Sequence, residues 1–202
     1  MKDFKNNLGQ SLLETVFAIG ILLIVVAAIM ALTTANLIGQ RESETQIIAN
    51  NLAREGIEVV RNIRDSNWLA GEDWDKDLVG DGTAIPIFEY NKAEERWENR
   101  WSLNFEVDSS NDNQAKVLVF ANIYNQQVVG SELLPAGDLP SGYSRILILD
   151  NICKKSDGSE EIKNSCGINE DKIGIEVESQ VSWFDRGQAR RVRLNDLLYD
   201  WK

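Results

Sequence analysis

The chain has 202 residues and a formal net charge of −11, and it contains no histidine. This length allows one domain with a hydrophobic core plus a further element. The acidic balance, without a long basic run, argues against nucleic-acid binding through a broad basic face, and no nucleic-acid partner is predicted. Histidine, the commonest general base and metal ligand, is missing, and so are a Gly-x-Ser-x-Gly motif and a glycine-rich phosphate loop. We therefore expect a protein without enzymatic activity.

A long apolar segment follows a short hydrophilic N-terminus. Residues 1–9 carry Lys2 and Lys5, and residues 15–40 carry no charged side chain. As a helix this segment would be about 39 Å long, which exceeds the roughly 30 Å hydrocarbon core of a bilayer. The two lysines favour a cytoplasmic N-terminus, so the rest of the chain is expected to lie outside the cytoplasm.

Three interpretations of this segment compete. A cleavable secretory signal has a shorter apolar region, although residues 33–35, Thr-Thr-Ala, could serve as its cleavage site. A plain single-pass anchor accounts for the lysines and the apolar length, but not for Gly9 placed five residues before Glu14. A lone carboxylate at the edge of a span is unfavourable unless it is paired. In the third interpretation, a helical assembly, the terminal ammonium of a neighbouring subunit pairs with Glu14 and sets the axial register.

The run Gly9-Gln10-Ser11-Leu12-Leu13-Glu14, followed at once by the apolar segment, resembles the class III signal of type IV prepilins and type II secretion pseudopilins. The resemblance implies that prepilin peptidase removes the leader 1–9 by cutting between Gly9 and Gln10, and methylates the new terminal nitrogen of Gln10. It also implies that other pilin subunits and an inner-membrane assembly platform are partners, along with the lipid bilayer.

This sequence departs from the family pattern in two places. Gln10 stands where the mature chain usually begins with Phe or Met, and a terminal Gln can cyclise and lose its positive charge. We hypothesise that N-methylation protects the pairing of this terminus with Glu14. The apolar segment also lacks the proline that many major pilins carry midway along this helix, so the extent to which the helix melts on assembly is left open.

A mixed helical pattern continues the helix beyond the membrane to about residue 64. The side chains that fall near one face are Ile48, Leu52, Val59 and Val60. We expect an α+β, pilin-like fold in which 10–40 form the transmembrane and filament-core helix and 41–66 form its outer half. This outer half should pack on an antiparallel sheet of four or five strands in an extracellular, β-rich globular head, 67–202.

The acidic segment 72–81 raises the question of calcium. Asp73, Asp75 and Asp77 alternate as at the start of an EF-hand loop. However, Leu78 occupies the position that requires Gly, and Ala84 occupies the position that requires a bidentate Glu. No metal or cofactor is therefore predicted, and these three aspartates are kept only as calcium candidates.

Alternation and short apolar runs predict strands at 101–107, 116–124, 145–149, 173–183 and 190–194, with a turn at 185–188. Cys153 and Cys166 bracket a loop between two of these strands and cannot form a four-thiolate zinc site alone. Outside the cytoplasm they can form one disulfide, worth roughly 3 kcal/mol in the chain-entropy estimate; two buried free thiols are the alternative. The six tryptophans are expected in the core or in subunit contacts rather than on a binding platform.

The segment 52–68 and the C-terminal pattern of 181–183, a turn, 190–194 and a final Leu and Trp also resemble PilV-like minor pilins and their relatives. The resemblance implies a structural subunit of a type IV pilus or related filament, with a minor PilV-like subunit favoured over the major pilin. Such filaments serve adhesion, motility, DNA uptake or secretion. It places the chain in the cytoplasmic membrane before assembly and on the cell surface afterwards. A type II secretion or DNA-uptake pseudopilin, and a single-pass membrane-anchored binding domain, are the alternatives.

Overall fold

The computed structural model describes residues 8–78, 81–91, 96–105, 115–120, 123–126 and 139–200. A single helix, α1 (Leu8–Ala70), precedes all of the strands in the described part of the chain. The strands are β1 (Asp81–Asn91), β2 (Arg96–Asn104), β3 (Lys116–Phe120), β4 (Ile123–Gln126), β5 (Leu139–Lys155), β6 (Glu160–Lys163), β7 (Glu170–Asp185) and β8 (Gln188–Tyr199). The predicted α+β class is confirmed. The chain forms two compact units, Met1–Gln46 and Ile47–Lys202.

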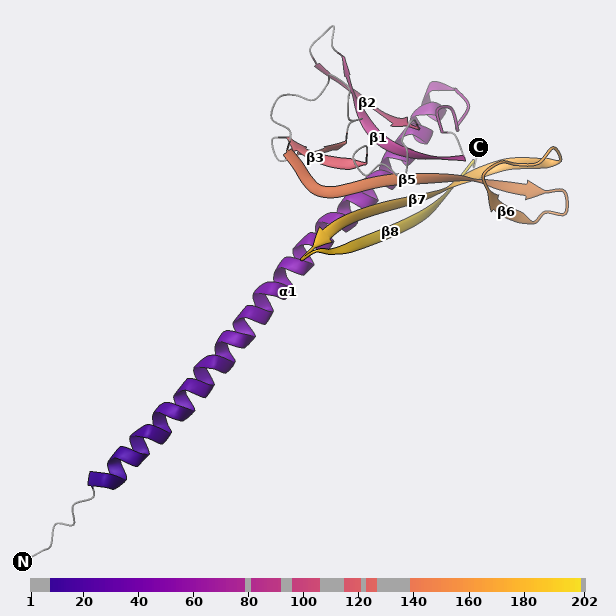
Figure 1. Cartoon of the computed structure of the whole chain (residues 1–202). Coiled ribbons are helices and arrows are strands. Elements are labelled where there is room, and N and C mark those ends of the chain that lie inside the picture. Colours follow the sequence, from indigo (N-terminus) through magenta and orange to yellow (C-terminus); the bar gives the residue numbers. More distant parts are fainter. Residues whose placement is uncertain are drawn as a thin grey trace, which may run out of the picture. The chain divides into compact units, whose positions relative to one another are not determined.

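The sheet of the second unit is built around β5, and its strand pairs are antiparallel (Figure 1). Strand β7 pairs with β5 from Tyr143 to Lys155. The opposite edge of β5 has three partners. Strands β3, β1 and β6 pair, in this order, with successive segments of it. Strand β8 extends the sheet beyond β7, through a hairpin that confirms the predicted turn at 185–188. Both turn residues, Arg186 and Gly187, have positive φ, as a two-residue hairpin turn of this kind requires.

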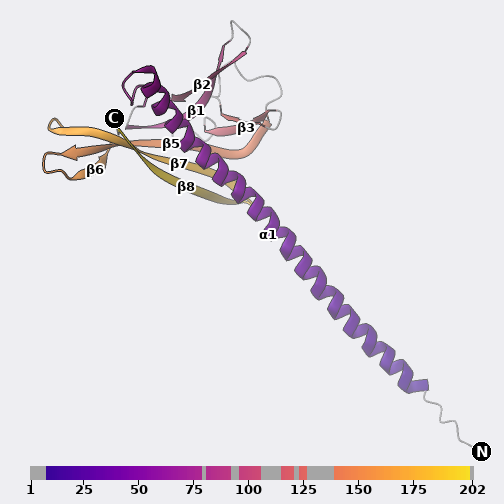
Figure 2. The same ribbon diagram turned by 180° about the vertical axis from the view of Figure 1, so that it is seen from behind.

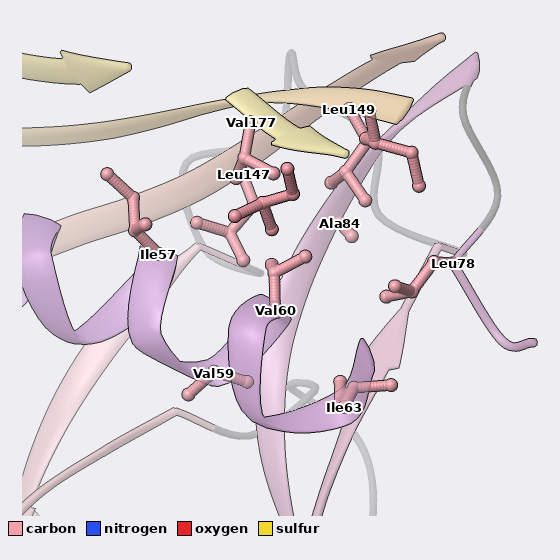
Figure 3. Packing of buried hydrophobic residues seen from close by; sticks show 11 residues of the cluster. Ile57, Val59, Val60, Ile63, Leu78, Ala84, Leu147, Leu149 and Val177 are labelled. Carbon is pink, nitrogen blue, oxygen red and sulfur yellow. The ribbon is translucent and has the colours of Figure 1, made fainter. Parts of the chain in front are cut away.

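The C-terminal part of α1 covers one face of this sheet, behind it in Figure 1 and in front of it in Figure 2. Its buried positions recur at intervals of three and four residues, which places them on one side of a helix. They are Ala49, Leu52, Ala53, Gly56, Ile57, Val59, Val60, Ile63 and Arg64. Ile57 and Val60 lie against Leu147 and Val177 of the sheet (Figure 3). This packing holds the two layers of the head together.

The helix approaches the sheet closely at Gly56. A Cβ added to this glycine would lie 2.7 Å from Leu147 Cδ2 and 2.7 Å from Ser179 Oγ. Leu147 and Ser179 are both fully buried, so neither can move aside into solvent. A side chain as small as that of alanine therefore does not fit at this crossing without a shift in the surrounding core.

The structure differs from the sequence prediction in the extent of several elements. The described residues form eight strands rather than four or five, because β1 and β6 carry weak alternation and escape detection. The strand predicted at 116–124 is two strands, β3 and β4, which pair with each other. The helix continues to Ala70, where Gly71, with φ 75°, ends it in the left-handed conformation. Val107 and Trp201 lie outside the described residues.

Candidate functional site

The residues of the proposed processing signal lie in the first turns of α1. Helix α1 begins at Leu8, so Gly9 and Gln10 belong to its first turn, and Glu14 follows one turn later. Gln10 and Glu14 are four residues apart along α1, slightly more than one turn. Glu14 is exposed to solvent in the isolated chain. Lys2 and Lys5 lie outside the described residues.

The apolar segment of α1 exposes nearly all of its large side chains. Between Leu12 and Ile38 the leucine, isoleucine, valine, phenylalanine and methionine side chains are mostly about 60% exposed. Soluble proteins do not normally present such a continuous apolar surface to water. By length and composition, α1 could cross a membrane once. A single span near the N-terminus is therefore compatible with this structure.

The few polar side chains within this segment are satisfied by the helix itself. Thr33 Oγ1 donates to the carbonyl oxygen of Ile29 at 2.9 Å, and Thr34 Oγ1 donates to that of Met30 at 2.8 Å. Thr15 Oγ1 likewise donates to Leu12 O at 2.8 Å. Hydroxyl groups paired in this way can enter an apolar medium without losing a hydrogen bond. The threonines therefore present no obstacle to burial of the segment in lipid or against other helices.

The two cysteines meet at the far end of β5. Cys153 and Cys166 form a disulfide with a Cα–Cα distance of 5.5 Å, and Cys153 is fully buried. The bridge closes the loop that carries β6. Glu170 reinforces this loop, because its carboxylate accepts from the Gly167 backbone N–H at 2.6 Å and pairs with Lys163 Nζ at 2.5 Å. Both contacts lower the pKa of Glu170, with the lysine contact contributing most.

The acidic segment after α1 is engaged in contacts with its own neighbours. Asp75 pairs with Lys172 Nζ at 2.7 Å, and the same ammonium lies 5.4 Å from the centre of the Trp74 ring. Asn67 Nδ2 donates to the carbonyl oxygen of Lys76 at 2.7 Å and fixes the turn. Among the described residues, no three His, Cys, Asp or Glu side chains gather closely enough to hold a metal ion. The structure thus does not bring Asp73, Asp75 and Asp77 together as a cation site.

A buried guanidinium joins the helix to the sheet. Arg145 on β5 is 1% exposed. Its Nη1 donates to the Leu52 carbonyl oxygen at 3.0 Å and to the Glu55 carboxylate at 2.8 Å, and its Nε donates to Gln126 Oε1 at 3.0 Å. Burial lowers the pKa of Arg145, while the nearby Glu55 carboxylate opposes this shift. The network fixes β4, β5 and α1 relative to one another.

A shallow polar cleft of about 340 Å³ lies beside this helix. Its charged lining is already paired. Arg61 contacts Glu58 at 2.6 Å and Asp196 at 2.5 Å, and Arg64 contacts Asp65 at 2.9 Å. The hydrogen bond to Asp196 is the main cause of the raised pKa of Arg61. Glu55, on the same lining, pairs with the buried Arg145, so each of these charged groups has a partner of opposite sign.

Most of the tryptophans whose side chains the structure describes are packing residues. Trp183 is 9% exposed and belongs to the core cluster with Ala49, while Trp74 and Trp101 pack against the cluster around Val60. The guanidinium of Arg64 lies 4.7 Å from the centre of the Trp68 ring. The side chain of Trp97 and all of Trp201 lie outside the described residues.

Comparison with protein-family models, with curated proteins and with solved structures finds no match to this chain. The functional argument therefore depends on the residues themselves. Sequence inspection did not single out Arg145, Gln126 or Gly56. Two of them carry a sequence signal: Arg145 lies within an apolar strand, and Gly56 lies within the apolar face of a helix.

Proposed function

We propose that this chain is a structural subunit of a type IV pilus or pilus-like filament. In this proposal prepilin peptidase cuts between Gly9 and Gln10. Before assembly the mature subunit spans the cytoplasmic membrane, with its head outside the cytoplasm. The observation that carries the proposal is Gly9, Gln10 and Glu14 at the start of α1, directly before an exposed apolar surface. A minor, PilV-like role is favoured by the resemblance of the segments 52–68 and 181–194.

The apolar side chains from Leu12 to Ile38 would serve two environments in turn. In the membrane they contact lipid, and in the filament they contact the helices of neighbouring subunits. Lipid tails are as apolar as leucine, so this transfer gains little from the hydrophobic effect and depends on side-chain packing and polar pairing. The polar pairing in our proposal is the contact between Glu14 and the terminal ammonium of Gln10 on a neighbouring subunit.

Glu14 is well placed for this role by its position in the helix. A carboxylate one turn from the helix start interacts favourably with the positive end of the helix dipole. That interaction is weak compared with the penalty of burying an unpaired charge in an apolar assembly. A subunit that docks one turn out of register would leave Glu14 without its partner. In this proposal Glu14 therefore fixes the axial position of the subunit in the filament.

The disulfide supports the placement of the head outside the cytoplasm. Disulfides persist in oxidising compartments and are rare in the reducing cytoplasm. The Cys153–Cys166 bridge in the structure is consistent with a head that lies outside the cytoplasm.

The decisive experiment is mass spectrometry of N-terminal peptides from surface filaments that have been sheared from cells. We expect a mature chain that begins with methylated Gln10 and is present at low abundance relative to a major subunit. A chain in the sheared fraction that still begins at Met1 would contradict processing, and absence from the filaments would favour a membrane-anchored binding domain. A predominantly pyroglutamate terminus would overturn the protective role of methylation.

A further inference from the structure

The tip of the β7–β8 hairpin, residues 184–191, combines an exposed aromatic ring with basic side chains. Phe184 is 75% exposed, although it follows the buried Trp183 directly. Arg186 and Arg191 are also exposed. The tip contains three arginines and one aspartate in a chain whose net charge is −11. It is therefore a local basic site on an acidic protein.

The register of the hairpin places Phe184 and Arg191 on the same side of the sheet. Ser182 pairs with Arg191 and Phe184 pairs with Ala189, so these four residues alternate with the inward-facing Trp183. Arg186 lies in the turn next to them, with φ 49°, and is exposed. The Phe184 ring and the Arg191 side chain thus belong to the side of the hairpin opposite Trp183, and Arg186 is exposed at its end.

The hairpin is attached to the part of the head that directly follows the candidate membrane span. On the inner side of the tip, Trp183 and Val181 pack in one cluster with Ala49, Leu52 and Ala53 of α1. These are among the first helical residues of the unit Ile47–Lys202. Eleven residues lead from Ile38, the last large apolar side chain of the exposed segment, to Ala49, and eleven helical residues cover about 16 Å. This end of the head is therefore connected to the span by a short length of chain.

We propose that the tip 184–191 docks on the anionic phospholipid surface of the membrane that α1 crosses. Phe184 would enter the interfacial region, and Arg186 and Arg191 would contact lipid phosphate groups. Aromatic rings favour the membrane–water interface, and arginine near an anionic surface gains from the negative surface potential and from paired hydrogen bonds to phosphate. The inference rests on the membrane-inserted form in the proposed function, and it assigns a resting position to the head before assembly.

A lipid surface fits this tip better than a second copy of the chain that presents the same face. Two copies facing each other would have to run antiparallel to bring their arginines onto acidic partners such as Glu176, near the middle of β7. A planar anionic surface needs no such inversion and offers a phosphate to each arginine.

The test is hydrogen exchange of the full chain in nanodiscs of phosphatidylcholine alone or with phosphatidylglycerol. We expect amides of 184–191 to exchange at least about tenfold more slowly in the anionic discs. The double substitution R186Q/R191Q should abolish this difference, and Phe184→Ser should reduce it. The matched control is Lys154→Gln, which removes an exposed cation at the opposite end of the β5–β7 pair and should leave the protection unchanged.

Each outcome of this experiment bears on the inference. Protected amides in 15–40 together with equal exchange of the tip in both discs would overturn the docking and leave the proposed function standing. Protection of the tip that rises with the number of chains per disc, whatever the lipid, would identify a second copy as the partner and also overturn it. Unprotected amides in 15–40 would show that α1 does not insert, and both proposals would then fail.

Discussion

The Nη1 atom of Arg145 on β5 lies 2.8 Å from the Glu55 carboxylate on α1, although the side chain of Arg145 is 1% exposed and that of Glu55 is 36% exposed. Arg145 thus lies within the buried interface of helix and sheet, whereas Glu55 lies at its solvent-exposed edge. Arg145 has two further acceptors in the interior, Leu52 O and Gln126 Oε1, whereas Glu55 can also be hydrated. The two partners should therefore contribute unequally to stability.

Replacement of Arg145 by methionine should lower the free energy of unfolding by about 3 kcal/mol, because two buried acceptors lose their donor. Glu55→Gln keeps an acceptor near the guanidinium and leaves a partly hydrated group, so we expect a loss of less than about 1.5 kcal/mol. Urea unfolding followed by near-ultraviolet circular dichroism measures both values. Equal losses for the two variants would show that the ion pair, rather than the interior network, holds the helix to the sheet.

Gly56→Ala should destabilise the head by about 1–3 kcal/mol. The substitution improves helix propensity by about 1 kcal/mol, but the new methyl group would lie 2.7 Å from two buried atoms, and we expect the steric term to dominate. Gly39→Ala is the matched control, since a Cβ there meets nothing within 4 Å. Thermal unfolding should show a lower midpoint for the first variant alone.

A second substitution tests whether the close contact itself is responsible. Ser179 Oγ is buried and has no hydrogen-bond partner, so Ser179→Ala removes one of the two clashing atoms without breaking a hydrogen bond. The double variant G56A/S179A should recover part of the lost stability. Strict additivity of the two changes would indicate that the loss at Gly56 arises elsewhere.

Asp150 makes stability depend on pH. Its pKa is raised from the ordinary 3.8, first by burial and then by repulsion from Glu176 and Glu178 on the neighbouring strand. A carboxyl group whose pKa is raised on folding destabilises the fold once the pH exceeds its unfolded value, and the penalty is complete above its folded value. Asp150→Asn should therefore stabilise the protein at pH 7, by up to about 1 kcal/mol, and should have no such effect near pH 3.

Denaturant unfolding of the wild type and of Asp150→Asn across this pH range measures the difference. Added salt should reduce the gain at pH 7, because it screens the repulsion between these partly exposed carboxylates. A gain that persists unchanged at pH 3 would assign the stabilisation to packing or hydrogen bonding of the amide instead of to the removed charge.

Reduction of the Cys153–Cys166 bridge should lower the free energy of unfolding by about 3 kcal/mol in the chain-entropy model. For a head of this size the expected fall in the melting midpoint is about 6–12 °C. The variant C153S/C166S should melt near the reduced protein and should not respond to a reductant. A reductant effect in that variant would trace the change to something other than the disulfide.

The processing signal is tested by two substitutions with opposite consequences. Gly9→Arg should block cleavage and leave the precursor in the membrane, whereas Glu14→Ala should permit cleavage but reduce incorporation into filaments by about tenfold or more, as the loss of a buried charge pair implies. Immunoblots of membrane and sheared fractions measure both steps. Normal incorporation of Glu14→Ala would remove the register role from Glu14 and leave the cleavage site unaffected.

The long helix and the last hairpin were predictable because their patterns are regular over many residues. The uncharged segment 15–40 needs no tertiary context, and the alternation along β7 and β8 marks one buried and one exposed face. Strand β1 could not be predicted because its alternation is weak. Strand β6 could not be predicted because it is exposed along most of its length and is positioned by the disulfide loop. The division of 116–124 into β3 and β4 depends on their pairing with each other, which local composition does not encode.

In the candidate site, too, local features could be predicted and long-range contacts could not. The spacing of Gly9, Gln10 and Glu14 is visible in the sequence, and the disulfide was one of two predicted states of the cysteines. The contacts of Arg145 with Gln126 and Glu55 join residues that lie 19 and 90 positions apart, and no local pattern reports such a meeting. The aspartates at 73–77 show the reverse case: their spacing in the sequence suggests a calcium site, but the fold does not bring their side chains together.

The arrangement of β5 has a consequence for the order in which the head can form. Its three partners on one edge differ widely in chain position, and its other edge is completed only by β7, near the end of the chain. The apolar side of α1 that carries Ile57 and Val60 emerges early in synthesis. Leu147 on β5 and Val177 on β7, which pack against it, follow Ile57 by 90 and 120 residues. At ordinary elongation rates this helical surface therefore lacks its covering strands for several seconds of synthesis.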